Sequence, residues 1–115
     1  GEDRFVLLQW EKPYLALFPE AKWEEIEARL ADYKKTGPQA MNHVRVLYAN
    51  LVEITPDKQG RILIPAGLQQ AAALSGTVIL LGTNDRVELW DPATYERVVQ
   101  GGAGDFEQFA YKLFG

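Results

Sequence analysis

The stretch "TPDKQGRILIP", residues 55–65, decides how the chain is read. Its centre, Asp57-Lys58-Gln59-Gly60, has turn chemistry, because an aspartate side chain can accept hydrogen bonds from turn amides and glycine adopts a positive φ without strain. Strand-forming sequences lie on both sides, "LVEIT" at 51–55 and "RILIP" at 61–65. The pattern predicts a β-hairpin with Lys58 at its tip and Arg61 at the start of the return strand.

Strands and helices alternate outward from this hairpin. Short apolar runs predict strands at 5–10, 14–18, 77–82 and 86–90. Apolar residues at helical spacing predict one helix from Pro19-Glu20 to Gly37 and a second from there to about Leu51. A short helical turn is expected at 66–74, and Asp91-Pro92 reads as an N-cap followed by proline at the first helical position. This mixture predicts the α+β class.

Composition narrows the classes of site that the chain can carry. It has 115 residues, of which 47% are apolar, and no cysteine, so disulfides and thiolate metal sites are excluded. No apolar run approaches the roughly 18 residues of a membrane span. The net charge of -4 argues mildly against a polyanionic partner for the average surface, but residues 41–61 carry a net charge of +1 while residues 85–107 carry -4. The segment that contains the hairpin is therefore less acidic than the rest of the chain.

An internal repeat organises the chain. When the chain is shifted by 72 residues, two segments align without gaps, with the identities Val6/Val78, Leu8/Leu80, Leu17/Leu89, Ala21/Ala93 and Glu24/Glu96. The aromatic pairs Phe18/Trp90 and Trp23/Tyr95 also match. Each unit reads as strand, turn, strand and helix, so the sequence predicts a duplicated supersecondary unit.

The repeat places the hairpin at 51–65 in front of the second unit only. Its counterpart in the first unit falls before residue 1. A remnant without these strands would leave open sheet edges. We therefore expect that the corresponding strands exist in the natural protein, or that a neighbouring chain supplies them.

The run "DKQGRILIP", with Asp57 and Arg61 in the spacing D-x-x-x-R, resembles the MraZ family of bacterial transcriptional regulators. "GEDRFVLL" resembles the back half of the first unit of that family, Ala40 to Val52 resembles the helix between its units, and "VELWDPATYERV" resembles the end of its second unit. The resemblance implies two AbrB-like swapped-hairpin β-barrel repeats with flanking helices. The boundaries become 1–36 for the back half of the first repeat, 37–50 for the inter-repeat helix, 51–100 for the second repeat and 101–115 for a glycine linker and C-terminal helix.

The resemblance also implies a function. MraZ proteins form ring-shaped homo-oligomers that bind repeated sites on double-stranded DNA and usually repress a division and cell-wall gene cluster. We therefore expect a cytoplasmic, nucleoid-associated regulator that needs no cofactor, has no enzymatic activity and does not act at a membrane. Carried over to this sequence, the motif assigns Lys58, Gln59 and Arg61 to DNA contact and Asp57 and Gly60 to support of the turn.

Two alternatives stay open. Asp57 and Arg61 can form an ion pair that only braces the turn, and the acidic chain with its detachable last helix can be a non-enzymatic protein-interaction or assembly module. His43 is the single histidine and lies beside an apolar stripe, which favours a partly buried or interface position over catalysis. Ser75 lacks the setting of a nucleophile, and Gly101–Gly104 reads as a linker rather than a phosphate loop. The stripe of Phe106, Phe109 and Leu113 suits either core packing or contact between protomers.

Overall fold

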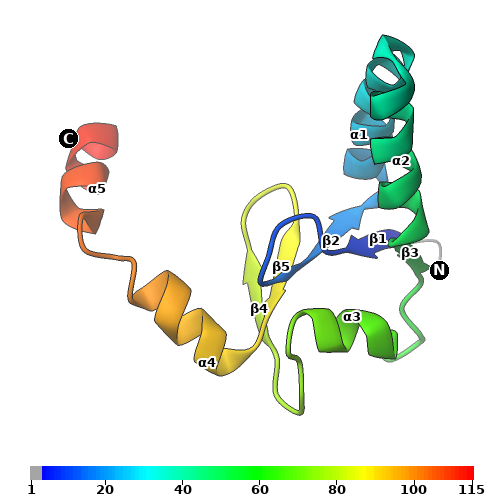
Figure 1. Ribbon diagram of the computed structural model, residues 1–115. Coiled ribbons are helices and arrows are strands. Elements are labelled where there is room, and N and C mark those ends of the chain that lie inside the picture. The colour runs from blue at the N-terminus through cyan, green and yellow to red at the C-terminus, as the bar shows by residue number, and fades with distance from the viewer. Residues whose placement is uncertain (1–3) are drawn as a thin grey trace.

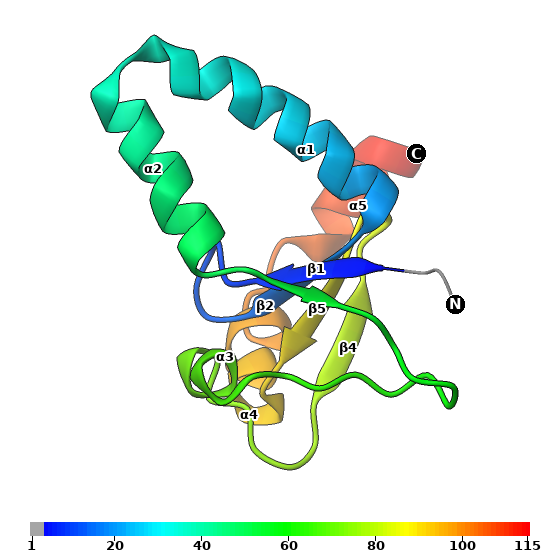
Figure 2. The same ribbon diagram turned by 90° about the vertical axis from the view of Figure 1, so that its right-hand side faces the viewer.

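The computed structural model describes residues 4–115, which form a five-stranded antiparallel sheet with helices on both sides (Figures 1 and 2). The strand order is β3-β1-β2-β5-β4. The strands are β1 (Phe5–Leu8), β2 (Leu15–Pro19), β3 (Val52–Ile54), β4 (Ile79–Gly82) and β5 (Val87–Trp90). The helices are α1 (Glu20–Tyr33), α2 (Pro38–Ala49), α3 (Ala66–Ala71), α4 (Pro92–Tyr95) and α5 (Phe106–Phe114), with a 3₁₀ turn η1 (Lys34–Thr36) and a π-helical turn η2 (Glu96–Gln100). The expected α+β class is confirmed.

The two faces of the sheet carry two separate cores, because successive strand residues point to opposite faces. Even-numbered residues of β1 and β2, such as Val6, Leu8 and Phe18, face α1, α2 and α4. Odd-numbered residues, such as Leu7 and Leu15, face α3 and the segments beside it, through Ala72 and Leu74. Each strand residue is thereby assigned to one of two cores with different packing partners.

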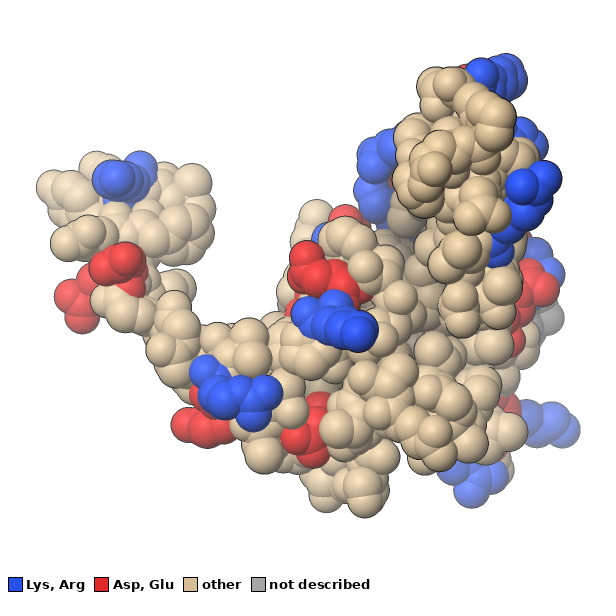
Figure 3. Space-filling view, in the orientation of Figure 1, with Lys and Arg blue, Asp and Glu red and all other residues tan. Residues whose placement is uncertain are grey.

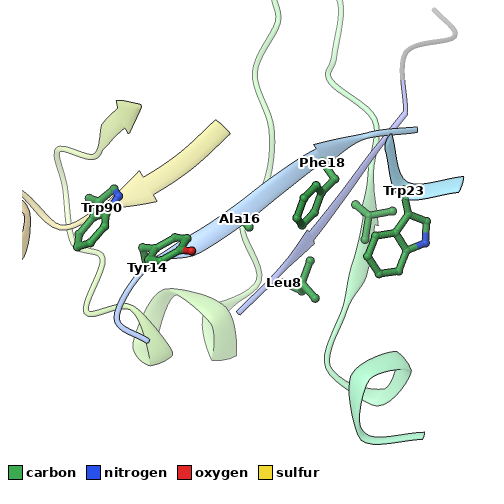
Figure 4. Close-up of a cluster of buried hydrophobic side chains, with 7 residues drawn as sticks. Leu8, Tyr14, Ala16, Phe18, Trp23 and Trp90 are labelled. Atoms are coloured by element: carbon green, nitrogen blue, oxygen red, sulfur yellow. The ribbon is translucent and has the colours of Figure 1, made fainter. Parts of the chain in front are cut away.

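Aromatic side chains fill the first core (Figure 4). Tyr14 stacks on Trp90 with ring centroids 5.0 Å apart, and Phe18 packs against the buried Trp23 of α1 at 6.0 Å. Trp23 also meets the edge of Tyr48 in α2, at 6.4 Å. We call the pair α1 and α2 the helical arm; it rises from the sheet with its turn at the outer end (Figure 2).

The register of the central strands follows the repeat. β2 and β5 pair antiparallel with Ala16 opposite Glu88, two positions that are 72 residues apart. A local two-fold axis therefore passes between these residues and relates β1-β2 to β4-β5. The helix alignment agrees with it, because Trp23 and its counterpart Tyr95 both pack in the first core.

The first strand of each unit departs from the ungapped alignment by one residue. Leu8 lies opposite Ala16, whereas Leu81 lies opposite Glu88. Leu8 therefore corresponds to Leu81 and Val6 to Ile79, and each of these pairs packs in the same core. The predicted match of Leu8 to Leu80 is wrong, because it joins a buried residue to one that is 67% exposed. The turn of the first unit holds the extra residue, because seven residues separate Leu8 from Ala16 and six separate Leu81 from Glu88.

The predicted hairpin at 51–65 forms only in part. β3 pairs with β1, and a backbone hydrogen bond from Asp57 N to Arg61 O (2.9 Å) closes the turn. The predicted return strand at 61–65 is wrong: this segment is extended but pairs with no strand among residues 4–115, and Leu63 is 83% exposed. The described strands accordingly form one open sheet rather than a closed barrel.

Helix α5 stands apart from the rest of the molecule (Figure 1). It follows the segment Gly101–Asp105 and has no buried residue. Among residues 4–115, no helix is both long and apolar enough to cross a membrane.

Candidate nucleic-acid interface

The turn after β3 projects away from the sheet and the helices (Figure 2), and the Asp57 carboxylate organises it. Asp57 Oδ1 accepts hydrogen bonds from the backbone N–H groups of Gln59 and Arg61, each at 2.9 Å. Gly60 N donates to the Asp57 carbonyl at 2.9 Å, and Gly60 has φ 79°. This positive φ is a conformation that residues with a Cβ rarely adopt. The predicted turn-supporting roles of Asp57 and Gly60 are therefore consistent with the geometry.

The same carboxylate also holds the Arg61 side chain. Arg61 Nε donates to Asp57 Oδ2 at 2.8 Å, and Arg61 Nη2 donates to Gln59 Oε1 at 3.1 Å. Arg61 Nη1 makes no hydrogen bond with any residue between 4 and 115, and the Arg61 side chain is 74% exposed. The guanidinium is thus oriented from one side and left with donors on the other, which is a suitable arrangement for binding phosphate or a guanine edge.

The remaining basic residue of the turn, Lys58, is exposed at the tip. Two cations and one carboxylate give residues 57–61 a formal charge of +1. Figure 3 shows that Lys and Arg side chains also lie along the helical arm. The structure thus brings all five predicted site residues into one turn. The Asp57–Arg61 ion pair agrees equally well with the alternative in which the pair only stabilises the turn.

The contacts with Arg61 lower the pKa of the Asp57 carboxyl group. Hydrogen bonds from the Arg61 backbone and side chain, with a further one from the Gln59 backbone, hold the pKa of Asp57 below its ordinary value of 3.8. Asp57 is consequently ionised throughout the physiological pH range, and its hold on Arg61 does not titrate there.

The other candidates give no sign of catalytic chemistry. His43 is exposed, so of the two expected positions, partly buried or at an interface, the first is wrong and the second stays a prediction. Its ring lies between Tyr33 Oη (2.6 Å from Nδ1) and the Gln39 amide (3.1 Å from Nε2). No group of three or more histidine and carboxylate side chains that could hold a metal occurs among the described residues.

Comparison with known proteins decides the family. The family model described as "MraZ protein, putative antitoxin-like" matches residues 47–112, which include the whole turn. The transcriptional regulator MraZ of Pelotomaculum thermopropionicum is 34% identical over 111 residues, covering 96% of this chain and 77% of that protein. The chain belongs to the MraZ family. The MraZ regulator of Thermoanaerobacter pseudethanolicus is 37% identical over the same length, covering 96% of this chain and 78% of that protein.

Membership of the MraZ family confirms the resemblance that the D-x-x-x-R motif suggested. MraZ is a family of transcriptional regulators and not of enzymes, so the expectation of a non-enzymatic regulator is also confirmed.

Proposed function

We propose that this protein represses transcription by binding repeated sites on double-stranded DNA through the turn at residues 57–61. In this proposal Lys58, Gln59 and Arg61 contact DNA, while Asp57 and Gly60 hold the turn in shape. The target is a bacterial division and cell-wall gene cluster. The protein acts in the cytoplasm, associated with the nucleoid, and needs no cofactor.

One observation carries this proposal: an exposed, projecting turn in which Asp57 fixes Arg61 on one side only. An exposed ion pair contributes little to stability, typically 0–1 kcal/mol. Orienting an arginine before it meets DNA reduces the entropy that binding costs.

The strand pairing supports the proposed division into repeats. β3 precedes the second unit in the chain but pairs with β1 of the first unit, which is the exchange that a swapped hairpin requires. We infer that 1–36 and 51–100 belong to two AbrB-like repeats joined by 37–50, with 101–115 as an appendage. By the local two-fold axis, the hairpin of the first repeat pairs along the outer edge of β4.

The small charge of each turn requires several turns to act together. A few phosphate contacts give weak, salt-sensitive binding. Linked copies bind more tightly, because the binding of one copy raises the effective concentration of the next copy at the DNA. We therefore propose a ring-shaped homo-oligomer in which turns of neighbouring protomers occupy successive DNA repeats and block polymerase.

The test uses the double variant Lys58→Ala with Arg61→Ala and fluorescence anisotropy with promoter DNA at several salt concentrations. We expect binding to fall at least about 100-fold, because each lost bidentate or phosphate contact contributes about 1–3 kcal/mol and the loss repeats in each protomer. The salt slope should fall with it. The matched control is Lys34→Ala with Lys35→Ala, which removes the same charge from exposed residues at the tip of the helical arm. Equal losses in both double variants would contradict the proposal.

The variant Asp57→Asn tests whether Asp57 orients the Arg61 side chain or only stabilises the turn. This variant removes a negative charge, so simple electrostatics predicts tighter DNA binding. If Asp57 positions Arg61, binding weakens despite the gain in charge. Tighter binding with an unchanged melting temperature would leave Asp57 without a positioning role.

A protein-interaction module remains the second candidate function, because α5 exposes a large apolar face. Normal DNA affinity of the Lys58/Arg61 double variant would favour it.

A further inference from the structure

Helix α5 exposes an apolar stripe that no residue between 4 and 115 covers. Phe106, Phe109 and Leu113 lie on one side of the helix and are 60%, 55% and 63% exposed, with Phe114 beside them at 82%. Tyr111 and the charged residues Glu107 and Lys112 lie on the other side. An isolated nine-residue helix is marginal in water, so this stripe has to be covered for α5 to be stable.

The repeat identifies α5 as the counterpart of α2, since each follows the helix that ends its unit. In the first unit, α2 covers α1 through Tyr48, which meets Trp23 and donates a hydrogen bond to Glu27 at 2.6 Å. In the second unit, the π-helical turn ends at Gln100 and α5 leaves the body (Figure 1). The second unit therefore has the covering helix without the intramolecular packing.

A groove of complementary character lies at the other end of the molecule. It has a volume of about 660 Å³ between α2, α3 and the end of β1, and its apolar lining includes Leu8, Trp10, Val46, Leu47, Leu51 and Leu68. Trp10 and Val46 are 52% and 55% exposed. Gly67, Ala71 and Ala49 form parts of its walls, and small side chains there leave room for bulky ones. A neighbouring pocket between α1 and α2 fits worse, because Lys22, Arg29, Asp85 and Arg86 line it.

We propose that α5 of one protomer docks in the α2–α3 groove of the next and so joins the protomers head to tail. This inference rests on the proposed function in one respect: it names the contact that assembles the DNA-binding ring. Because the donor helix and the acceptor groove are different surfaces, the contact is heterologous. Such contacts build rings when the rotation between protomers closes, and not two-fold dimers.

The length of the linker favours a second copy over self-docking. Residues 101–105 span at most about 18 Å when fully extended. The molecule extends over 42 Å, and α5 and α2 lie at opposite ends of it (Figure 1). In this structure α5 lies away from the groove of its own chain, and the short linker favours the groove of a second copy.

The apolar area that α5 exposes is also consistent with a second copy. Phe106, Phe109, Leu113 and Phe114 are 60%, 55%, 63% and 82% exposed, so together they can bury roughly 400–600 Å². A stable interface buries roughly 800 Å² per partner. Helix α5 can thus supply a large part of one side of such an interface.

Disulfide trapping tests the contact directly, because the chain has no cysteine of its own. The double variant Val46→Cys with Phe109→Cys is made in the full natural chain, oxidised and run on a non-reducing gel. We expect a ladder of cross-linked species beyond the dimer. The control, Val46→Cys with Tyr111→Cys, moves the α5 cysteine to the opposite side of the same helix and should cross-link much less.

A second measurement guards against chance cross-links. Sedimentation of Phe109→Asp should show self-association weakened about 30-fold or more, as expected for a buried interface anchor, and Tyr111→Asp should leave it unchanged. A rapid intramolecular band in place of the ladder, or an unchanged assembly of Phe109→Asp, would overturn the proposal.

The proposed function has a separate outcome in this experiment. If Phe109→Asp is monomeric and loses DNA affinity, both proposals gain support. If it is monomeric but binds DNA as tightly as the wild type, the docking stands and the dependence of DNA binding on avidity is refuted. If the assembly is unaffected, the docking is refuted while the DNA-binding turn still stands.

Discussion

The helices of the two repeats are packed differently. In the first, α1 and α2 pack against each other and against the sheet, with Trp23 only 6% exposed. In the second, the helix is shorter, ends in a π-helical turn, and its covering helix α5 lies apart with every aromatic residue more than half exposed. The first unit thus covers its apolar surface internally, whereas the second leaves that of α5 exposed.

The largest effect is expected at the core of the self-contained arm. Trp23→Ala removes a buried aromatic that contacts Phe18 and Tyr48, so we expect the free energy of unfolding to fall by about 3–5 kcal/mol. The counterpart Tyr95→Ala should cost less, because that side chain is partly exposed and has no α2-like cover. Urea denaturation followed by circular dichroism measures both. Equal losses would mean that the two helices are packed alike.

An intermediate effect is expected at the start of the helices. Asp91 Oδ2 accepts hydrogen bonds from Thr94 N (3.0 Å) and Thr94 Oγ1 (2.9 Å), so Asp91→Ala should lower the free energy of unfolding by about 1 kcal/mol. Asp105 occupies the same position in α5 but makes no capping hydrogen bond. Asp105→Ala should therefore leave thermal unfolding unchanged, and a loss similar to that of Asp91→Ala would show that α5 is anchored more firmly than its exposure suggests.

The smallest effect concerns the hydroxyl that links α2 to α1. Partial burial, the hydrogen bond to Glu27 and the charge of Glu27 raise the pKa of Tyr48 to about 12. Because the folded pKa lies above the unfolded value of 10, the contribution of this tyrosine to stability is complete below pH 10 and is lost as the pH rises toward 12. Absorbance titration near 295 nm should show that Tyr48→Phe removes a late-ionising group. If Tyr48→Phe instead removes an early-ionising group, the Tyr48 hydroxyl does not bind Glu27, and this link between α2 and α1 is absent.

Local sequence rules were reliable where the structure is local. The stripe that predicted the helix from Glu20 to Tyr33 needs only helical spacing, and Asp91-Pro92 needs only cap chemistry. The five proposed site residues could be placed together for the same reason, since all lie in one turn. Non-local pairing decided the failures. "RILIP" has strand propensity, but a strand requires a partner, and β3 pairs with β1 instead.

Two further features depended on the assembled fold. A one-residue difference between the two hairpin turns cannot be seen in an alignment that matches leucine to leucine, although it moves a side chain from one face of the sheet to the other. The α2–α3 groove joins Trp10 to Val46, which lie 36 positions apart on a strand end and a helix, so no motif marks it. His43 is exposed in the single chain because its hydrogen bonds to Tyr33 and Gln39 satisfy the ring at the surface.

The pairing of Ala16 with Glu88 has a consequence for the history of the chain. In a dimer of two identical single units, the residue on the axis faces its own copy, and a glutamate there would sit opposite a second glutamate and be repelled. Fusion of the units into one polypeptide removed that requirement. A fully buried alanine now occupies one side, and Glu88, which accepts a hydrogen bond from Trp90 at 3.0 Å, occupies the other. In a single polypeptide the two sides of the axis can therefore carry different residues.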